Sequence, residues 1–102
     1  MLYFKSCFMA DTLDRTFFES HLREDFQVDG GPIALKLVEC NRMKSQSGEL
    51  REPFSLLFRG PAESMLPQRS YALSNERTGQ IEIFLVPVAR DAAGLTYEAV
   101  FN

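Results

Sequence analysis

Five residues of this chain are candidates for catalytic groups: its histidine, one of its serines and three of its glutamates. His21 is the only histidine, the residue type that most often acts as a general base near neutral pH. No serine or cysteine motif would place a nucleophile beside it, and Ser55 lies in a strand-like run without the Gly-x-Ser-x-Gly turn of hydrolases. The sequence therefore predicts a packing or capping role for His21 and a place in a β-ladder for Ser55.

The three glutamates lie in strand-like segments, where two carboxylates could act together as an acid and a base. Glu52, Glu82 and Glu98 are the candidates, and glycosidases use such pairs. The alternative is that Glu82 and Glu98 lie on the outer surface of a sheet and pair with cations such as Arg59 or Arg69. We favour charge pairing, so the sequence predicts a protein that is not an enzyme.

Cofactor and metal signals are also missing from the sequence. A zinc site needs four soft ligands in close pairs, whereas the chain has one histidine and two cysteines, Cys7 and Cys40. The cysteines could pair by number alone, but we expect two free thiols in a reducing compartment. The glycines at 30, 31 and 60 are not followed by Lys-Ser or Lys-Thr, so they predict turns and not a phosphate site.

Composition sets the size and class of the protein. The chain has 102 residues, of which 45% are hydrophobic, enough for one domain with a single core. The net charge of −3 and the scattered cations argue against nucleic-acid binding. The apolar stretch Met1–Phe8 is too short for a signal peptide or a membrane span. We expect residues 1–11 to be a disordered or non-native extension, residues 12–102 to form the domain, and the protein to be cytoplasmic.

Three segments are apolar on both faces of a would-be strand. They are the run REPFSLLFRGP at 51–61, the run IEIFLVPV at 81–88 and the chain end YEAVFN at 97–102. A sheet with one face in water would alternate apolar and polar side chains, so these strands must be covered on both faces.

Turn signals divide the rest of the domain into further strands and one helix. The pattern from Thr16 to Glu19 fits a capping box and predicts a helix from about Phe17 to Arg23. A change in phase at Leu37 predicts a bulge, and Pro87 predicts either a bulge or an edge. The strands are expected at about 26–28, 33–43, 53–59, 70–74, 80–88 and 95–101. The fold class is therefore mainly β, a six-stranded antiparallel meander closed into a barrel or barrel-like roll, with one short N-terminal helix.

In such a barrel, alternate side chains fill the interior. The expected interior set is Ile33, Leu35, Phe54, Leu56, Phe58, Tyr71, Leu73, Ile81, Ile83, Leu85, Tyr97, Ala99 and Phe101. The opposite side of the strands carries Leu57, Phe84, Val86, Val88 and Val100. A helix of this length spans only about 10 to 12 Å, so Phe17, Phe18 and Leu22 could cover two or three strands of that outer face.

The apolar remainder of the outer face predicts a contact surface for another protein or for copies of the same chain. Arginine is common in interface hot spots. The predicted contact residues are therefore Leu57, Arg59, Arg69, Val86 and Val100. For Arg59, pairing with Glu52 or with loop carbonyls remains an equal alternative. A small-ligand-binding barrel with a pocket lined by Phe54, Tyr71 and Tyr97 is the other function left open.

Four motifs in order resemble a known family. They are REPFSLLFRGP at 51–61, LPQR at 66–69, FLVPV at 84–88 and YEAVFN at 97–102. The chain resembles a small family of bacterial single-domain proteins of unknown function over roughly residue 12 to the end. Members are often encoded beside phage-tail-collar proteins of the kind called microcystin-dependent. The resemblance implies a non-enzymatic structural or assembly protein that accompanies a tail-like partner, and it implies no site residues.

Overall fold

The computed structural model describes residues 14–43 and 53–101, which form one short helix and six strands. The predictions for Cys7, Glu52 and the extension 1–11 lie outside the described residues. Among those that are described, no helix is long and apolar enough to cross a membrane. The elements are α2 (Arg15–Glu19), β1 (Asp25–Val28), β2 (Ala34–Arg42), β3 (Phe54–Gly60), β4 (Arg69–Asn75), β5 (Gly79–Asp91) and β6 (Gly94–Phe101).

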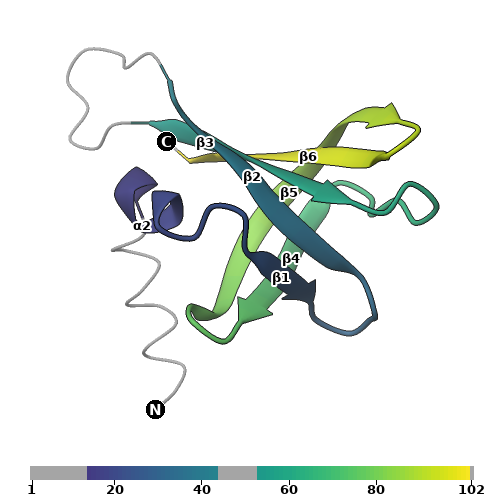
Figure 1. Ribbon diagram of the computed structural model, residues 1–102, viewed down its shortest axis with the longest axis horizontal. Coiled ribbons are helices and arrows are strands. Elements are labelled where there is room, and N and C mark those ends of the chain that lie inside the picture. The colour runs from purple at the N-terminus through teal and green to yellow at the C-terminus, as the bar shows by residue number, and fades with distance from the viewer. Residues whose placement is uncertain (1–13, 44–52, 102) are drawn as a thin grey trace.

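The six strands form a closed, barrel-like ring in the order β1-β2-β3-β6-β5-β4, and every neighbouring pair is antiparallel (Figure 1). The predicted fold class is confirmed. The predicted meander is wrong, because β3 pairs with β6 and β4 closes the ring against β1. The connection at 61–68 is long enough to cross the end of the ring, so β4 need not lie beside β3.

The two longest strands each change neighbour along their length. β5 pairs with β4 up to Leu85 and with β6 from Val86 onward. β2 pairs with β1 through Lys36 and with β3 from the same residue onward. Each carries a register shift, between Leu37 and Glu39 in β2 and between Pro87 and Ala89 in β5. The first confirms the predicted bulge, and the second decides for a bulge over an edge at Pro87. A bulge increases local twist, which lets one long strand serve two sides of a small ring.

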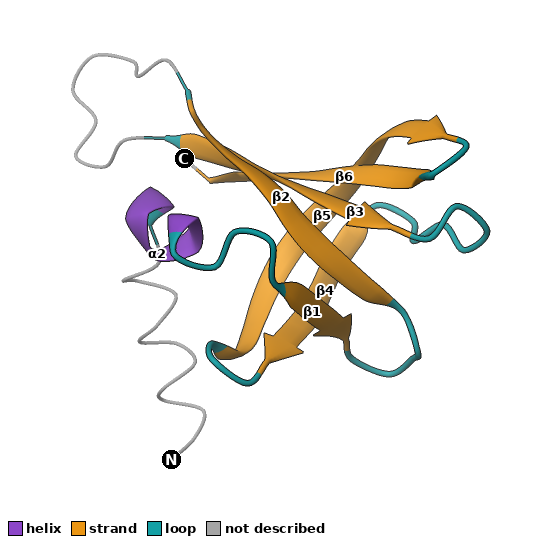
Figure 2. Ribbon diagram, viewed as in Figure 1, coloured by secondary structure: helices purple, strands orange, loops and turns teal. Residues whose placement is uncertain are grey.

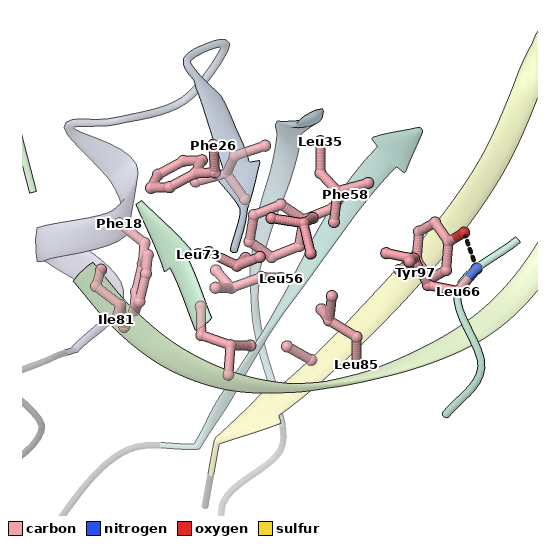
Figure 3. Packing of buried hydrophobic residues seen from close by; sticks show 14 of the residues in the cluster. Phe18, Phe26, Leu35, Leu56, Phe58, Leu66, Leu73, Ile81, Leu85 and Tyr97 are labelled. Carbon is pink, nitrogen blue, oxygen red and sulfur yellow. Dashed lines mark hydrogen bonds between the residues drawn. The ribbon is translucent and has the colours of Figure 1, made fainter. Parts of the chain in front are cut away.

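Side chains fill the interior of the ring (Figure 3). Most of the predicted interior set is buried, but Ile33, Tyr71 and Phe101 are only partly buried. The sequence-based set missed several core residues from the short strand β1, the bulged part of β2, the helix, the 61–68 connection and the start of β6. These are Phe18, Phe26, Val28, Leu37, Leu66 and Leu95.

The helix covers one end of the ring and does not lie on its outer face (Figure 2). Phe18 is fully buried, and its ring centroid lies 6.0 Å from that of Phe54 and 5.5 Å from that of Phe101. Both partners point inward from the ends of β3 and β6 and stack on each other at 4.7 Å. The prediction that the helix packs across outer strands is therefore wrong, because Phe18 instead completes the core at this end.

The helix also begins earlier than predicted. Asp14 is the N-cap, and its side chain accepts a hydrogen bond from the backbone N–H of Phe17 at 2.9 Å. The predicted capping box from Thr16 is wrong, since Thr16 is already inside the helix. Aspartate and threonine both cap helices, so the sequence alone offered two starts. The helix ends at Glu19, and the chain then turns through Arg23, whose φ is 75°.

The opposite end of the ring is closed by the 61–68 connection. The backbone N–H of Leu66 donates to the hydroxyl of Tyr97 at 2.9 Å, and both residues are buried (Figure 3). Buried polar groups need such partners, because an unpaired one costs roughly 1–3 kcal/mol. This hydrogen bond holds the connection to the core at Leu66. Both ends of the interior are thus covered by the chain's own residues.

Candidate functional site

Three exposed apolar side chains lie on the outer side of β5 and β6. Phe84 and Val88 are each 50% exposed and Val100 is 47% exposed. Their strand neighbours Ile83, Leu85 and Ala99 are buried in the core. Side chains alternate along a strand, so Phe84 and Val100 point away from the interior.

Val86 on β5 and Leu57 on β3 are partly buried and extend this group toward β3. Val86 lies opposite Glu98 in the β5–β6 ladder, and Glu98 lies opposite Leu57 in the β3–β6 ladder. Leu57, Glu98 and Val86 therefore form one row across three neighbouring strands. We call the surface made by Leu57, Phe84, Val86, Val88 and Val100 the outer apolar face. No described helix covers it, because α2 lies at the end of the ring.

Three of the five predicted contact residues come together on this face. They are Leu57, Val86 and Val100, one on each of β3, β5 and β6. The prediction omitted Phe84 and Val88 from the contact set, although alternation along β5 had already placed both on the outer side. Their exposure ranks above that of Leu57 and Val86, which a sequence pattern cannot show.

Arg59 lies at the β3 end of the same side but is engaged within the chain. Its guanidinium donates to Thr96 Oγ1 at 2.7 Å and to Asp91 Oδ1 at 3.0 Å. Asp91 also accepts from the backbone N–H groups of Ala93 and Gly94, so the pair organises the β5–β6 turn. The predicted pairing of Arg59 with Glu82 or Glu98 is wrong, because its partner is Asp91 at the end of β5, which the strand pattern did not suggest.

The Arg59–Asp91 pair predicts a loss of stability in acid. The hydrogen bond from Arg59, followed by that from Ala93, lowers the pKa of Asp91 below its ordinary value of 3.8. A lowered folded-state pKa means that the ionised carboxylate favours folding, so this contribution is complete above about pH 4 and is lost as pH falls through the folded-state pKa. We expect Asp91→Asn to be less stable than wild type near neutral pH by urea unfolding, with the difference shrinking below about pH 4. A difference that stays constant into strong acid would show that the carboxylate's charge is irrelevant.

Arg69 does not join the outer apolar face. It lies opposite Leu85 in the β4–β5 ladder, and its guanidinium carbon lies 5.4 Å from the ring centroid of Tyr71. The Tyr71 hydroxyl donates to the carbonyl of Pro67, and burial is the main cause that raises its pKa. Arg69 therefore packs beside the connection that closes the ring, and its role as a partner contact stays a prediction.

His21 lies in a polar cluster near the start of β1. Its Nδ1 lies 2.9 Å from Glu24 Oε1, and Glu24 also binds Arg77 and the side-chain amide of Asn75. The hydrogen bond with His21 is the largest cause that lowers the pKa of Glu24. Neither Glu82 nor Glu98 takes part in the described hydrogen bonds of this cluster. It joins the segment before β1 to the β4–β5 turn, which is a structural arrangement.

Cys40 and the acidic residues do not form a metal centre in the part of the chain that is described. No group of three or more histidine, cysteine, aspartate or glutamate side chains there could hold a metal ion. Cys40 is partly buried, its thiol donates to the carbonyl of Arg15 at 3.5 Å, and burial raises its pKa. Its contact with α2 makes it part of the packing of the helix against β2.

Comparison with known proteins gives a family and no activity. No curated protein and no solved structure matches the chain. One family model matches residues 13–101, and its description names no activity, partner or tail protein. That range agrees with the extent of the resemblance carried by the four sequence motifs. The chain therefore belongs to the family described as Domain of unknown function (DUF6916).

Proposed function

We propose that the protein is a non-enzymatic structural or assembly protein that binds another protein through its outer apolar face. One observation carries this proposal: Phe84, Val88 and Val100 are about half exposed on two neighbouring strands, whereas Ile83, Leu85 and Ala99, beside Phe84 and Val100, are buried. Exposed apolar groups that cluster over neighbouring strands are typical of protein contact surfaces. The helix contributes to the core at the end of the ring, which leaves this face available.

The filled interior favours this function over a small-ligand-binding barrel. Two of the residues that the sequence offered as pocket lining are engaged in the core. Phe54 stacks on Phe101 and packs against Phe18, while the hydroxyl of Tyr97 accepts a hydrogen bond from the backbone of Leu66. A ligand in the interior would have to displace these contacts. A partner on the outer face displaces only water.

The outer apolar face does not identify the partner, whose proposed identity comes from the family resemblance. The four motifs resemble a family encoded beside tail-collar proteins, and that resemblance alone supports a tail-like partner. The chemistry of the face is compatible with any protein that presents apolar side chains to it, including a second copy of the chain. A tail-collar protein is therefore the first partner to test.

A double variant on the outer face tests the proposal. We expect Leu57→Asp together with Val100→Asp to abolish association with the partner, because each change places a carboxylate where an apolar contact would form. Association is measured by pull-down with a co-expressed tail-collar protein and by light scattering of the isolated chain. Circular dichroism and urea unfolding report whether the variant remains folded.

The matched control adds the same two charges elsewhere. Thr16 on α2 and Ala34 on β2 are both exposed and lie outside the face. Thr16→Asp together with Ala34→Asp should leave association unchanged. If the outer-face variant unfolds while this control folds, Leu57 and Val100 belong to the core and the proposed contact surface is wrong.

A further inference from the structure

We propose that the outer apolar face recognises a protein segment in which a lysine or arginine lies between apolar side chains, with Glu98 receiving the cation. This inference rests on the proposed function and specifies the chemistry of the partner. The position of Glu98 within the face is the observation that leads to it.

Glu98 lies in the middle of the apolar row. It is half-buried, with Leu57 opposite it on β3 and Val86 opposite it on β5. Across the residues the structure describes, no cation forms an ion pair or hydrogen bond with its carboxylate. A partner that covered the face with apolar groups alone would remove water from this charge and leave it unpaired, which opposes binding.

Other carboxylates of the chain have a cationic partner, which Glu98 lacks among the described residues. Asp91 binds Arg59, Asp25 lies 3.1 Å from Lys36, and Glu24 binds Arg77. Two cations lie two residues from the face along its strands: Arg59 is paired with Asp91, and Arg90 donates to the carbonyl of Ala62. The carboxylate at the centre of the face is left to a cation from outside the described chain.

The same charge argues against a second copy as the occupant. A two-fold dimer joins the same surface of both copies, so it would bring Glu98 toward its own counterpart. Glu39 and Glu82, next to the face on β2 and β5, add further negative charge. Like charges in contact oppose association, whereas a basic partner would be attracted and held in register. The charges therefore favour a different protein with a basic residue.

Selection from a random peptide library tests this inference without knowledge of the natural partner. The full chain is immobilised, ribosome-displayed peptides are selected on it, and peptides that also bind the Leu57→Asp, Val100→Asp variant are removed. We expect the remaining peptides to be enriched in lysine or arginine flanked by apolar residues. Their affinity should fall on the order of tenfold for Glu98→Gln, a change that keeps the size of the side chain. Glu76→Gln, which removes the same charge from the β4–β5 turn, is the control and should leave affinity unchanged.

The outcomes separate this inference from the proposed function. Peptides that need the outer apolar face but lack basic residues, or that bind Glu98→Gln as tightly as wild type, would overturn the role of Glu98 and leave the contact surface intact. A selection that yields no peptide dependent on the face would overturn both. Self-association through the face, lost in the Leu57→Asp, Val100→Asp variant, would also contradict the inferred basic partner.

Discussion

Phe18→Ala is expected to lower the free energy of unfolding by about 3–5 kcal/mol, the usual cost of removing a buried phenylalanine. Phe18 is fully buried and contacts the stacked rings of Phe54 and Phe101. Both partners belong to the ring of strands, so the cavity left by the truncation would open at the end of the core. Urea unfolding followed by circular dichroism measures the loss.

The neighbouring residue provides the control. Phe17 lies on the same short helix, is only partly buried and contacts the edge of Phe18 and the ring of His21. Phe17→Ala changes helix propensity as much as Phe18→Ala does, so the difference between the two variants reports burial alone. Equal losses in the two variants would mean that the helix is not seated in the core through Phe18.

Gly94→Ala is expected to destabilise the domain by about 1–3 kcal/mol, in the range of other substitutions that overfill a packed site. A methyl carbon added at Gly94 would lie 2.4 Å from the backbone oxygen of Gly60. Backbone atoms cannot rotate away as a side chain can. The start of β6 would have to move from the end of β3, where Gly60 pairs with Leu95. The loss is measured as a lower midpoint of thermal or urea unfolding.

Gly31 is the matched position for this test. A methyl carbon there would meet no atom within 4 Å, and its backbone has no positive φ. Gly31→Ala should therefore leave the midpoint nearly unchanged or raise it slightly, since alanine reduces the freedom of the unfolded chain. If Gly94→Ala behaved like Gly31→Ala, the close approach of β3 and β6 would be wrong.

The strands could be predicted because their signals are local. Alternation of apolar side chains, the phase change at Leu37 and the proline at 87 each depend on a few neighbouring residues, and the ladders confirm them. The order of strands in the ring depends on contacts between distant segments. A meander and the observed order would give the same local pattern, so the pairing of β3 with β6 could not be deduced.

The position of the helix was ambiguous for a related reason. An apolar stripe shows that a helix is covered on one side, but it does not say by what. Phe18 would be equally suited to the outside of a sheet or to the open end of the ring. In the structure Phe18 is buried against Phe54 and Phe101, which places the helix at the end of the ring.

The candidate site also has one part that the sequence predicts and another that it does not. Alternation placed Leu57, Val86 and Val100 on one side of their strands, and the ladders bring them onto three neighbouring strands. The partners of Arg59 and the isolation of Glu98 depend on register and on the β5–β6 turn. No spacing in the sequence could have shown that Asp91, and not a strand glutamate, binds Arg59.

The most direct test of whether the outer apolar face binds another protein is photo-crosslinking in the cells that make this protein. A photoreactive amino acid is placed at Val100, within the face, and in a separate variant at Ala34, which is exposed on β2 outside it. We expect a covalent adduct with a second protein from position 100 and none from position 34. The absence of an adduct at position 100, or the same adducts from both positions, would contradict the account.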